Sequence, residues 1–316
     1  MKKHAFMLLL LLTACGVWGQ NSPTKPIISL RATVDYLRLR AKPDKSAAVI
    51  AELPEHSQLL YLGETGGAFE DVTLRGVPHQ ARWYKVSPTG ASAQIGWVYG
   101  GAVAVSSVYL PEGVSPASVQ EDFLKISPLS KNDFEKGALI AQNDLLRDSI
   151  EHQVNDTTIV LNFDNGSQRI IQDTIRPEFD GENTVTYKYL GQFAGIGQYV
   201  VELWGYEWNV IFFLDRRDGT TLGSLGYPYG LPALSPDQKW VALAYADPYE
   251  TEGGIQFFLA DKMRLYQAFN LQQTDRAGRG YWSAAKGEFC FAWEPLFDNV
   301  GDPSRIQYFH LKIVER

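Results

Sequence analysis

The sequence predicts an all-β protein, in which two β domains are joined by a short helical connector. Aromatic residues are abundant, with 16 Tyr, 16 Phe and 8 Trp among 316 residues. Runs of aromatic and β-branched residues outnumber long helical patterns, which favours strands. The turn pairs Asn165-Gly166 and Asp218-Gly219 follow alternating runs and indicate hairpins. The length is that of about two domains.

Composition excludes some classes of function. The chain is 45% hydrophobic and 21% charged, as in soluble globular proteins. Its formal net charge is −7 and no region is strongly basic, so we expect no nucleic-acid partner. The chain has no G-x-S-x-G, no H-E-x-x-H and no phosphate-binding glycine loop. Its five histidines lack metal-ligand spacing: His4, His56, His79, His152 and His310. We therefore expect no catalytic residue, metal or cofactor.

The first residues have the pattern of an export signal. Lys2 and Lys3 precede an apolar run that is too short to span a membrane as a mature helix. The run ends in Leu-Thr-Ala before Cys15, which resembles the lipobox of bacterial lipoproteins. The resemblance implies that 1–15 is a lipoprotein signal peptide, that Cys15 carries a lipid anchor, and that the protein faces the periplasm at the outer membrane. An ordinary signal cleaved after Gly19, giving a periplasmic or secreted protein, remains open.

The next segments are a tether over 16–27 and a small β domain over 28–105. The domain shows DYLRLRAKP at 35–43, RWYKV at 82–86 and IGWVYGG at 95–101. These motifs, in this order, resemble a bacterial SH3 (SH3b) domain. Lys42-Pro43 stands where Gly-Pro is usual, and His56 replaces a frequent glycine. The resemblance implies an SH3-like barrel that recognises a peptidoglycan peptide or an envelope protein.

Aromatic residues of this domain are its candidate ligand contacts. Trp83 and Trp97 fit the core better, because a small barrel needs large side chains to fill it. Tyr84 and Tyr99 fit a core position and a ligand contact equally well, so both are retained as candidate ligand-binding residues.

Residues 106–155 are predicted as a linker with one helix. Ser130 or Asn132 is suited to cap a helix that begins around Asp133. A stripe of apolar positions follows, at Phe134, Ala138, Leu139, Leu145 and Leu146. We expect the stripe to lie on one of the two β domains; a partner-binding helix is the alternative.

Residues 156–316 form a series of hairpins with a weak internal repeat. The repeated unit is a turn, a strand, a loop and a second strand, with a spacing of about 40–50 residues, which is typical of propeller blades. The segment LSPDQKWVAL at 234–243 resembles the SPDG turn of TolB-type and WD40-like β-propellers, with Gln238 in place of glycine. The resemblance implies a small or partial propeller, and a twisted β-sandwich is the competing architecture.

Loops of this domain carry the remaining candidate ligand contacts. Tyr and Trp are favoured in binding sites, and loops on rigid scaffolds carry function. The candidates are Trp204, Tyr206, Trp208, Tyr227, Tyr229 and Tyr249. Carboxylates in the same turns lack any known calcium-binding pattern, so we interpret them as solvated and predict no metal site.

Cys290 lies in an apolar strand-like run and is interpreted as a buried structural thiol without a disulfide partner.

Taken together, these motifs predict a non-catalytic envelope binding protein. Two alternatives remain open: an envelope hydrolase with an unidentified acidic active site, and a structural scaffold without a ligand.

Overall fold

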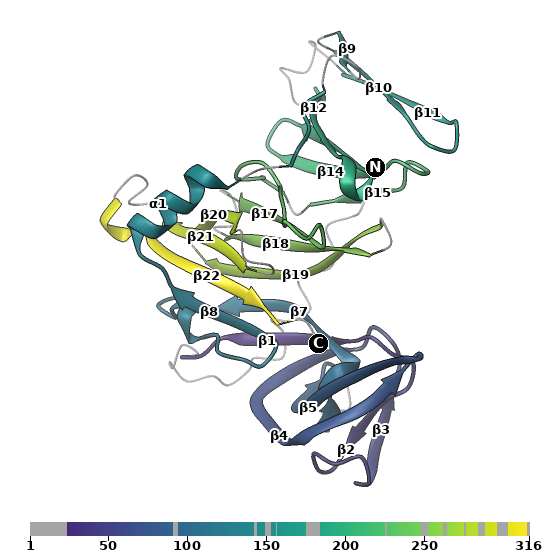
Figure 1. Cartoon of the computed structure of the whole chain (residues 1–316), viewed down its shortest axis with the longest axis vertical. Coiled ribbons are helices and arrows are strands. Elements are labelled where there is room, and N and C mark those ends of the chain that lie inside the picture. The colour runs from purple at the N-terminus through teal and green to yellow at the C-terminus, as the bar shows by residue number, and fades with distance from the viewer. Residues whose placement is uncertain are drawn as a thin grey trace.

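A computed structural model describes residues 24–90, 94–141, 144–148, 153–155, 157–174, 184–224, 226–247, 252–261, 264–274, 276–283, 288–295 and 303–314. In these ranges the chain is nearly all β-structure, in four sheets, with one α-helix. Figure 1 shows the barrel at one end of the molecule and the β9–β15 strands at the other. The predicted all-β fold is confirmed. The signal segment, Cys15 and most of the tether lie outside the described residues.

The barrel resembles the predicted SH3-like domain. Its strands are β1 (Ile27–Ala32), β2 (Leu37–Arg40), β3 (Val49–Leu53), β4 (Gln58–Leu74), β5 (Val77–Pro88), β6 (Gly96–Tyr99) and β7 (Val103–Leu110), with a 3₁₀ turn η1 (Gly100–Ala102) before β7. The hydrogen-bonded order is β7-β1-β4-β5-β6-β2-β3. Arg75 and Gly76 both have positive φ, +48° and +83°, so they close the long β4–β5 hairpin with a tight two-residue turn.

The C-terminal strands form hairpins that extend this sheet and build three more. β16 (Ala233–Leu234), β17 (Trp240–Asp247), β18 (Glu252–Asp261) and β19 (Arg264–Thr274) continue the barrel sheet through β7. A second sheet contains β20 (Arg276–Trp282), β21 (Glu288–Pro295), β22 (Gln307–Ile313) and β8 (Leu124–Pro128). The third contains β12 (Thr186–Phe193), β13 (Gln198–Trp204), β14 (Asn209–Asp215) and β15 (Thr221–Gly223). The fourth contains β9 (Gln153–Asn155), β10 (Thr158–Asn162) and β11 (Gln168–Gln172). Short 3₁₀ turns are η2 (Pro116–Ser118), η4 (Ala194–Ile196) and η5 (Pro303–Arg305).

The sheets stack because their strands are apolar on both faces. In β17, Val241 and Leu243 pack toward the β12–β15 sheet, whereas Trp240 and Ala242 pack into the core that also holds the barrel. Successive side chains of a strand point to opposite faces. A strand with two apolar faces therefore has to lie between two layers.

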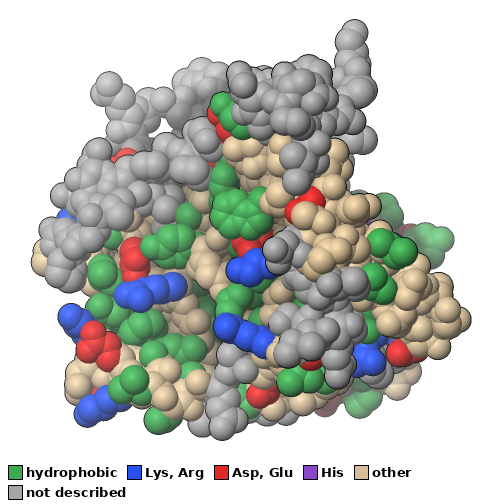
Figure 2. Space-filling model, turned by 90° about the horizontal axis from the view of Figure 1, so that it is seen from above, with side chains coloured by type: hydrophobic (Ala, Val, Ile, Leu, Met, Phe, Trp, Pro, Cys, Tyr) green, Lys and Arg blue, Asp and Glu red, His purple; other side chains and the backbone are tan. Residues whose placement is uncertain are grey.

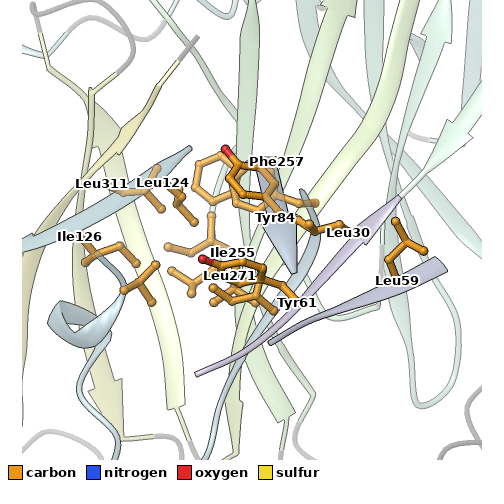
Figure 3. Close-up of a cluster of buried hydrophobic side chains, with 14 of the residues drawn as sticks. Leu30, Leu59, Tyr61, Tyr84, Leu124, Ile126, Ile255, Phe257, Leu271 and Leu311 are labelled. Atoms are coloured by element: carbon orange, nitrogen blue, oxygen red, sulfur yellow. The ribbon is translucent and has the colours of Figure 1, made fainter. Parts of the chain in front are cut away.

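One core joins the barrel to the C-terminal sheets. Leu30 and Tyr84 of the barrel, Leu124 of β8, and Phe257 and Leu271 of β18 and β19 belong to the same buried cluster (Figure 3). The parallel pairing of β7 with β19 adds backbone hydrogen bonds to this contact. The barrel and the sheets beside it are therefore one packed unit.

The segment predicted as a linker is built into the sheets. β7 extends to residue 110 and β8 pairs with β22, so 106–128 is held by strands as well as by turns. The helix α1 (Lys131–Ile140) begins after Ser130, whose Oγ accepts a hydrogen bond from Asp133 N at 3.1 Å. Phe134 is buried against Tyr281 and Tyr308. Leu139 is 86% exposed. The helix thus packs on the sheet through Phe134 and not through the whole predicted stripe.

The repeat corresponds to successive antiparallel hairpins. β13–β14, β17–β18 and β21–β22 occupy equivalent positions in their sheets, and Ser235 begins the SPD turn before β17. The Oγ of Ser235 accepts a hydrogen bond from Trp240 N at 2.9 Å. Among the described strands, no pairing joins the β9–β11 sheet to the β20–β22 sheet, so a closed propeller is not confirmed. The packed layers are those of a β-sandwich arrangement.

Asp218, in the turn after β14, is expected to make stability depend on pH. Hydrogen bonds from Thr220, with Arg264 Nη2 at 3.0 Å from Asp218 Oδ2, lower the pKa of Asp218 to about 2 from its ordinary 3.8. A carboxyl whose pKa is lowered by folding stabilises the protein above its unfolded pKa, and this contribution is lost as pH falls through the folded value. We expect the urea midpoints of the native chain and Asp218→Asn to differ at pH 6 and to converge as pH falls from 3.8 towards 2. An equal difference at every pH would contradict this.

Candidate functional site

A groove on the barrel is the strongest candidate for a ligand site. It lies between the β1–β2 loop and the tip of the β4–β5 hairpin and has a volume of about 380 Å³. Pockets for small ligands typically measure about 300–1,000 Å³. The hairpin reaches this position because β4 and β5 stay paired up to Leu74 and Val77.

The floor of the groove is aromatic. Trp83 is only 3% exposed and its ring lies edge-on to Tyr99, with centroids 5.8 Å apart. The Tyr99 hydroxyl is held by the carbonyl oxygens of Glu70 at 2.7 Å and His79 at 2.8 Å. Trp83 Nε1 has no hydrogen-bond partner among the described residues. A buried donor without a partner costs about 1–3 kcal/mol, so an acceptor from a ligand would be favourable here.

Ion pairs hold the rim of the groove together. Arg75 Nη2 lies 3.2 Å from Asp35 Oδ2 and 3.0 Å from Glu55 Oε2, which joins the hairpin tip to two neighbouring turns. These carboxylates raise the pKa of Arg75. Tyr36 is 74% exposed with a φ of +57°, a conformation in which the loop displays its side chain.

Cations dominate the lining beyond Arg75. Arg38, Arg40 and Lys45 also line the groove, against the single acidic lining residue Asp35. Arg40 Nη1 is held by the carbonyl oxygen of Ala47 at 2.6 Å. An excess of positive charge at an aromatic groove favours ligands that carry carboxylates.

The two barrel tyrosines predicted as ligand contacts are buried. Tyr84 is 1% exposed, and its ring packs edge-on against Tyr61 and Phe123 with centroids 5.7 and 5.3 Å away. Figure 3 shows Tyr84 inside the core shared with the C-terminal sheets. Tyr99 is 6% exposed and contributes to the groove floor. Of this pair, the structure brings only Tyr99 to the candidate groove.

The predicted C-terminal contacts lie elsewhere. Trp204, Tyr206 and Trp208 surround the β13–β14 turn and are 49%, 57% and 46% exposed. Tyr227 N donates to the carbonyl oxygen of Asn209, the residue after Trp208, at 2.8 Å. These residues therefore share one region, separate from the barrel groove. Seen from above, in the view of Figure 2, hydrophobic side chains are spread among Lys, Arg, Asp and Glu.

Two further candidates complete the predicted set. Tyr229 is 40% exposed and its hydroxyl donates to Glu294 Oε2 at 3.4 Å. Tyr249 lies outside the described residues.

Cys290 is buried at the contact between α1 and the β20–β22 sheet. The strand register places it directly opposite His310, an arrangement that invites comparison with a Cys–His pair. Burial raises the pKa of the Cys290 thiol, however, and Cys290 packs with Phe134 and Ala292. A thiol with a raised pKa is a poor nucleophile, which favours the structural role.

The groove residues Tyr36, Arg38 and Lys45 were not among the sequence-predicted contacts. For Tyr36 and Arg38 the signal was in the alternation of the first motif, where Leu37 and Leu39 point into the barrel and are 3% and 0% exposed. Their neighbours in a strand must then point outward. Lys45 lies in the loop after β2 and had no such signal.

Comparison with known proteins supports the assignment of the barrel. Residues 35–104 match the family model for the bacterial SH3 domain. The SH3b resemblance is thus confirmed for this domain, and at family level it suggests a cell-wall or peptidoglycan binding role. Bacterial SH3 domains occur in envelope-associated proteins. Neither a curated protein nor a solved structure shows a significant match to the chain.

The described residues offer neither a metal-binding cluster nor a membrane-spanning helix. The described part of the chain contains no group of three or more His, Cys, Asp or Glu side chains placed to hold a metal ion. Within it, no helix is both long and apolar enough to cross a membrane.

Proposed function

We propose that the chain is a non-catalytic binding protein of the bacterial envelope, and that the barrel groove takes cell-wall peptide. The main support is that the groove lies within the segment that matches the bacterial SH3 domain. The second candidate partner is an envelope protein that presents an extended acidic segment to the same groove.

The chemistry of the groove supports a peptide ligand. Cell-wall peptides carry free carboxylates and amide carbonyls. Lys45 supplies charge for the carboxylates, as does Arg38, whose Nε also lies 3.5 Å from Glu52 Oε1. The unpaired Trp83 Nε1 lies buried in the floor of the groove. Tyr36 offers an exposed aromatic face at the rim. None of these roles requires a bond to be broken, so binding alone accounts for the arrangement.

The location of the protein belongs to the same proposal. We infer that Cys15 is lipidated, that 16–27 spaces the barrel from the outer membrane, and that the groove faces the periplasmic cell wall. The diacylglyceryl group expected on a lipobox cysteine has two acyl chains, and two such chains give stable membrane attachment. Metabolic labelling with a fatty-acid analogue tests the anchor: Cys15→Ser should abolish incorporation.

The binding prediction uses the chain from residue 21 to its end, which keeps every described residue. We expect this protein to co-sediment with purified peptidoglycan sacculi, and Tyr36→Ala to weaken retention by about three- to tenfold, because an exposed aromatic anchor is lost. Tyr206→Ala, which removes an equally accessible tyrosine at the β13–β14 turn, is the matched control. Unchanged retention of Tyr36→Ala with loss in Tyr206→Ala would place the site at the C-terminal turn.

The same samples separate the alternatives. Sacculi that release soluble fragments on incubation would support the envelope hydrolase, and a zymogram would detect that activity. A failure of the native chain to sediment would overturn cell-wall binding and favour the scaffold or a protein partner.

A further inference from the structure

A second groove lies on the seam between the barrel and the C-terminal sheets. Its volume is about 510 Å³, and it shares no lining residue with the barrel groove. It is bounded by β1, β7 and η1 of the barrel, by the ends of β17, β18 and β19, and by the start of β8 and the end of β22. Figure 1 shows β7 between β1 and β19, where the two parts of the sheet meet.

The groove exists because β7 and β19 pair only over part of their lengths. Their parallel pairing covers Asn270–Gln273 against Ser107–Leu110 and stops there. The β1–β7 register shifts at Ser106, and the β18–β19 register shifts at Ala268. A bulge bends its strand and increases the local twist. Both strands therefore bend at the point where their pairing ends.

Beyond this point each strand has an open edge. The 103–106 stretch pairs with β1, and the 265–269 stretch pairs with β18. On their facing sides, neither stretch pairs with another described strand. Open strand edges present backbone N–H and C=O groups, and an added strand satisfies them. The seam is thus shaped for an extended main chain.

The lining of the groove combines apolar walls with basic side chains. Leu30, Leu259 and Phe269 form apolar walls. Arg31, His79 and Lys239 also line the groove, and none of its described lining residues is acidic. Arg31 makes no ion pair with a described residue.

One buried donor adds an independent indication of a ligand. Trp240 lines the groove and is 9% exposed, and its Nε1 has no hydrogen-bond partner among the described residues. In the same core, the Nε1 of Trp282 donates a hydrogen bond to the carbonyl oxygen of Ala233 at 2.9 Å. Buried indole N–H groups usually find an acceptor, so the Trp240 donor is an unsatisfied polar group in the wall of the groove.

We propose that this seam groove binds an extended acidic peptide segment, which adds as a strand to the open edges of β7 and β19. The peptide's backbone pairs with the edges, its apolar side chains face the walls, and a carboxylate lies near Arg31 and Lys239. A fatty acid would match the charge and the apolar walls but would leave the backbone edges unpaired.

The test uses the chain from residue 21 to its end and two synthetic probes. The first is acetyl-Val-Thr-Val-Thr-Glu with a free carboxylate; the second is acetyl-Val-Pro-Val-Pro-Glu, which keeps the carboxylates but lacks two backbone donors. We expect saturable binding of the first probe below about 1 mM and weaker binding of the second by about tenfold. Hydrogen exchange should slow in peptides that cover 103–106 and 264–269.

Variants assign the effect to the groove. Arg31→Gln should weaken binding of the first probe by about threefold or more, because a charge that faces the carboxylate is removed. Lys188→Gln removes an exposed charge from β12 and should leave binding unchanged. The proposal is overturned by any of four results: no saturable binding, equal binding of the proline probe, no protection at the two edges, or competition by dodecanoate with equal protection.

Discussion

Replacing Phe257 with alanine is expected to destabilise the barrel together with the C-terminal sheets. Phe257 is fully buried in β18, stacked on Phe269 at 4.6 Å between ring centroids and edge-on to Phe289 at 5.5 Å. Removing a buried phenyl ring loses its transfer free energy and leaves a cavity, at a cost of about 3–5 kcal/mol. We expect the free energy of unfolding to fall by this amount.

The loss of stability should be seen in both parts of the molecule. Phe257 shares its core with Leu30 and Tyr84, so barrel strands should lose protection as well. Native-state hydrogen exchange of β2 and β17 measures both parts. Phe69→Ala removes an aromatic ring that is 58% exposed on the barrel, and should change stability by less than about 0.5 kcal/mol. Loss of protection in β17 with an unaltered β2 would show that the barrel unfolds independently.

Local patterns were sufficient to predict much of this fold. The alternation of Leu37 and Leu39 and the turn at Asn165-Gly166 are determined by residues close in sequence. The β10–β11 hairpin indeed closes around Gly166, whose φ is +80°. The SPD turn at Ser235 and the cap at Ser130 are local as well. Each of these features depends on backbone groups only a few residues away.

Features that depend on distant contacts were harder to predict. The pairing of β7 with β19 joins residues more than 160 positions apart, and no local pattern encodes it. The same pairing places Tyr84 in a shared core, whereas in an isolated barrel that face would be open to solvent. Tyr84 therefore could not be separated from a ligand contact by its sequence position. Arg38 and Tyr36 were within reach of the alternation argument, but the groove that gives them a role needs the β4–β5 tip.

Replacing Gln273 with leucine is expected to disrupt the polar contact that closes the seam. Gln273 is 6% exposed in β19. Its Nε2 donates to the carbonyl oxygens of Pro111 at 3.0 Å and Val114 at 3.1 Å. Its Oε1 accepts from Trp293 Nε1 at 2.6 Å. Leucine keeps the size of the side chain, but the carbonyl oxygens of Pro111 and Val114 and the indole N–H of Trp293 lose their partner.

The expected loss is large because the groups left behind are buried. An unsatisfied buried donor or acceptor costs about 1–3 kcal/mol, so we expect Gln273→Leu to lower the free energy of unfolding by about 2–5 kcal/mol. Urea unfolding followed by circular dichroism measures it. Gln267→Leu, on the same strand but exposed, should change stability by less than about 0.5 kcal/mol. If both variants unfold at the native midpoint, the hydrogen bonds of Gln273 do not hold 111–114 on β19, and apolar packing together with the backbone pairing of β7 and β19 joins the barrel to the C-terminal sheets.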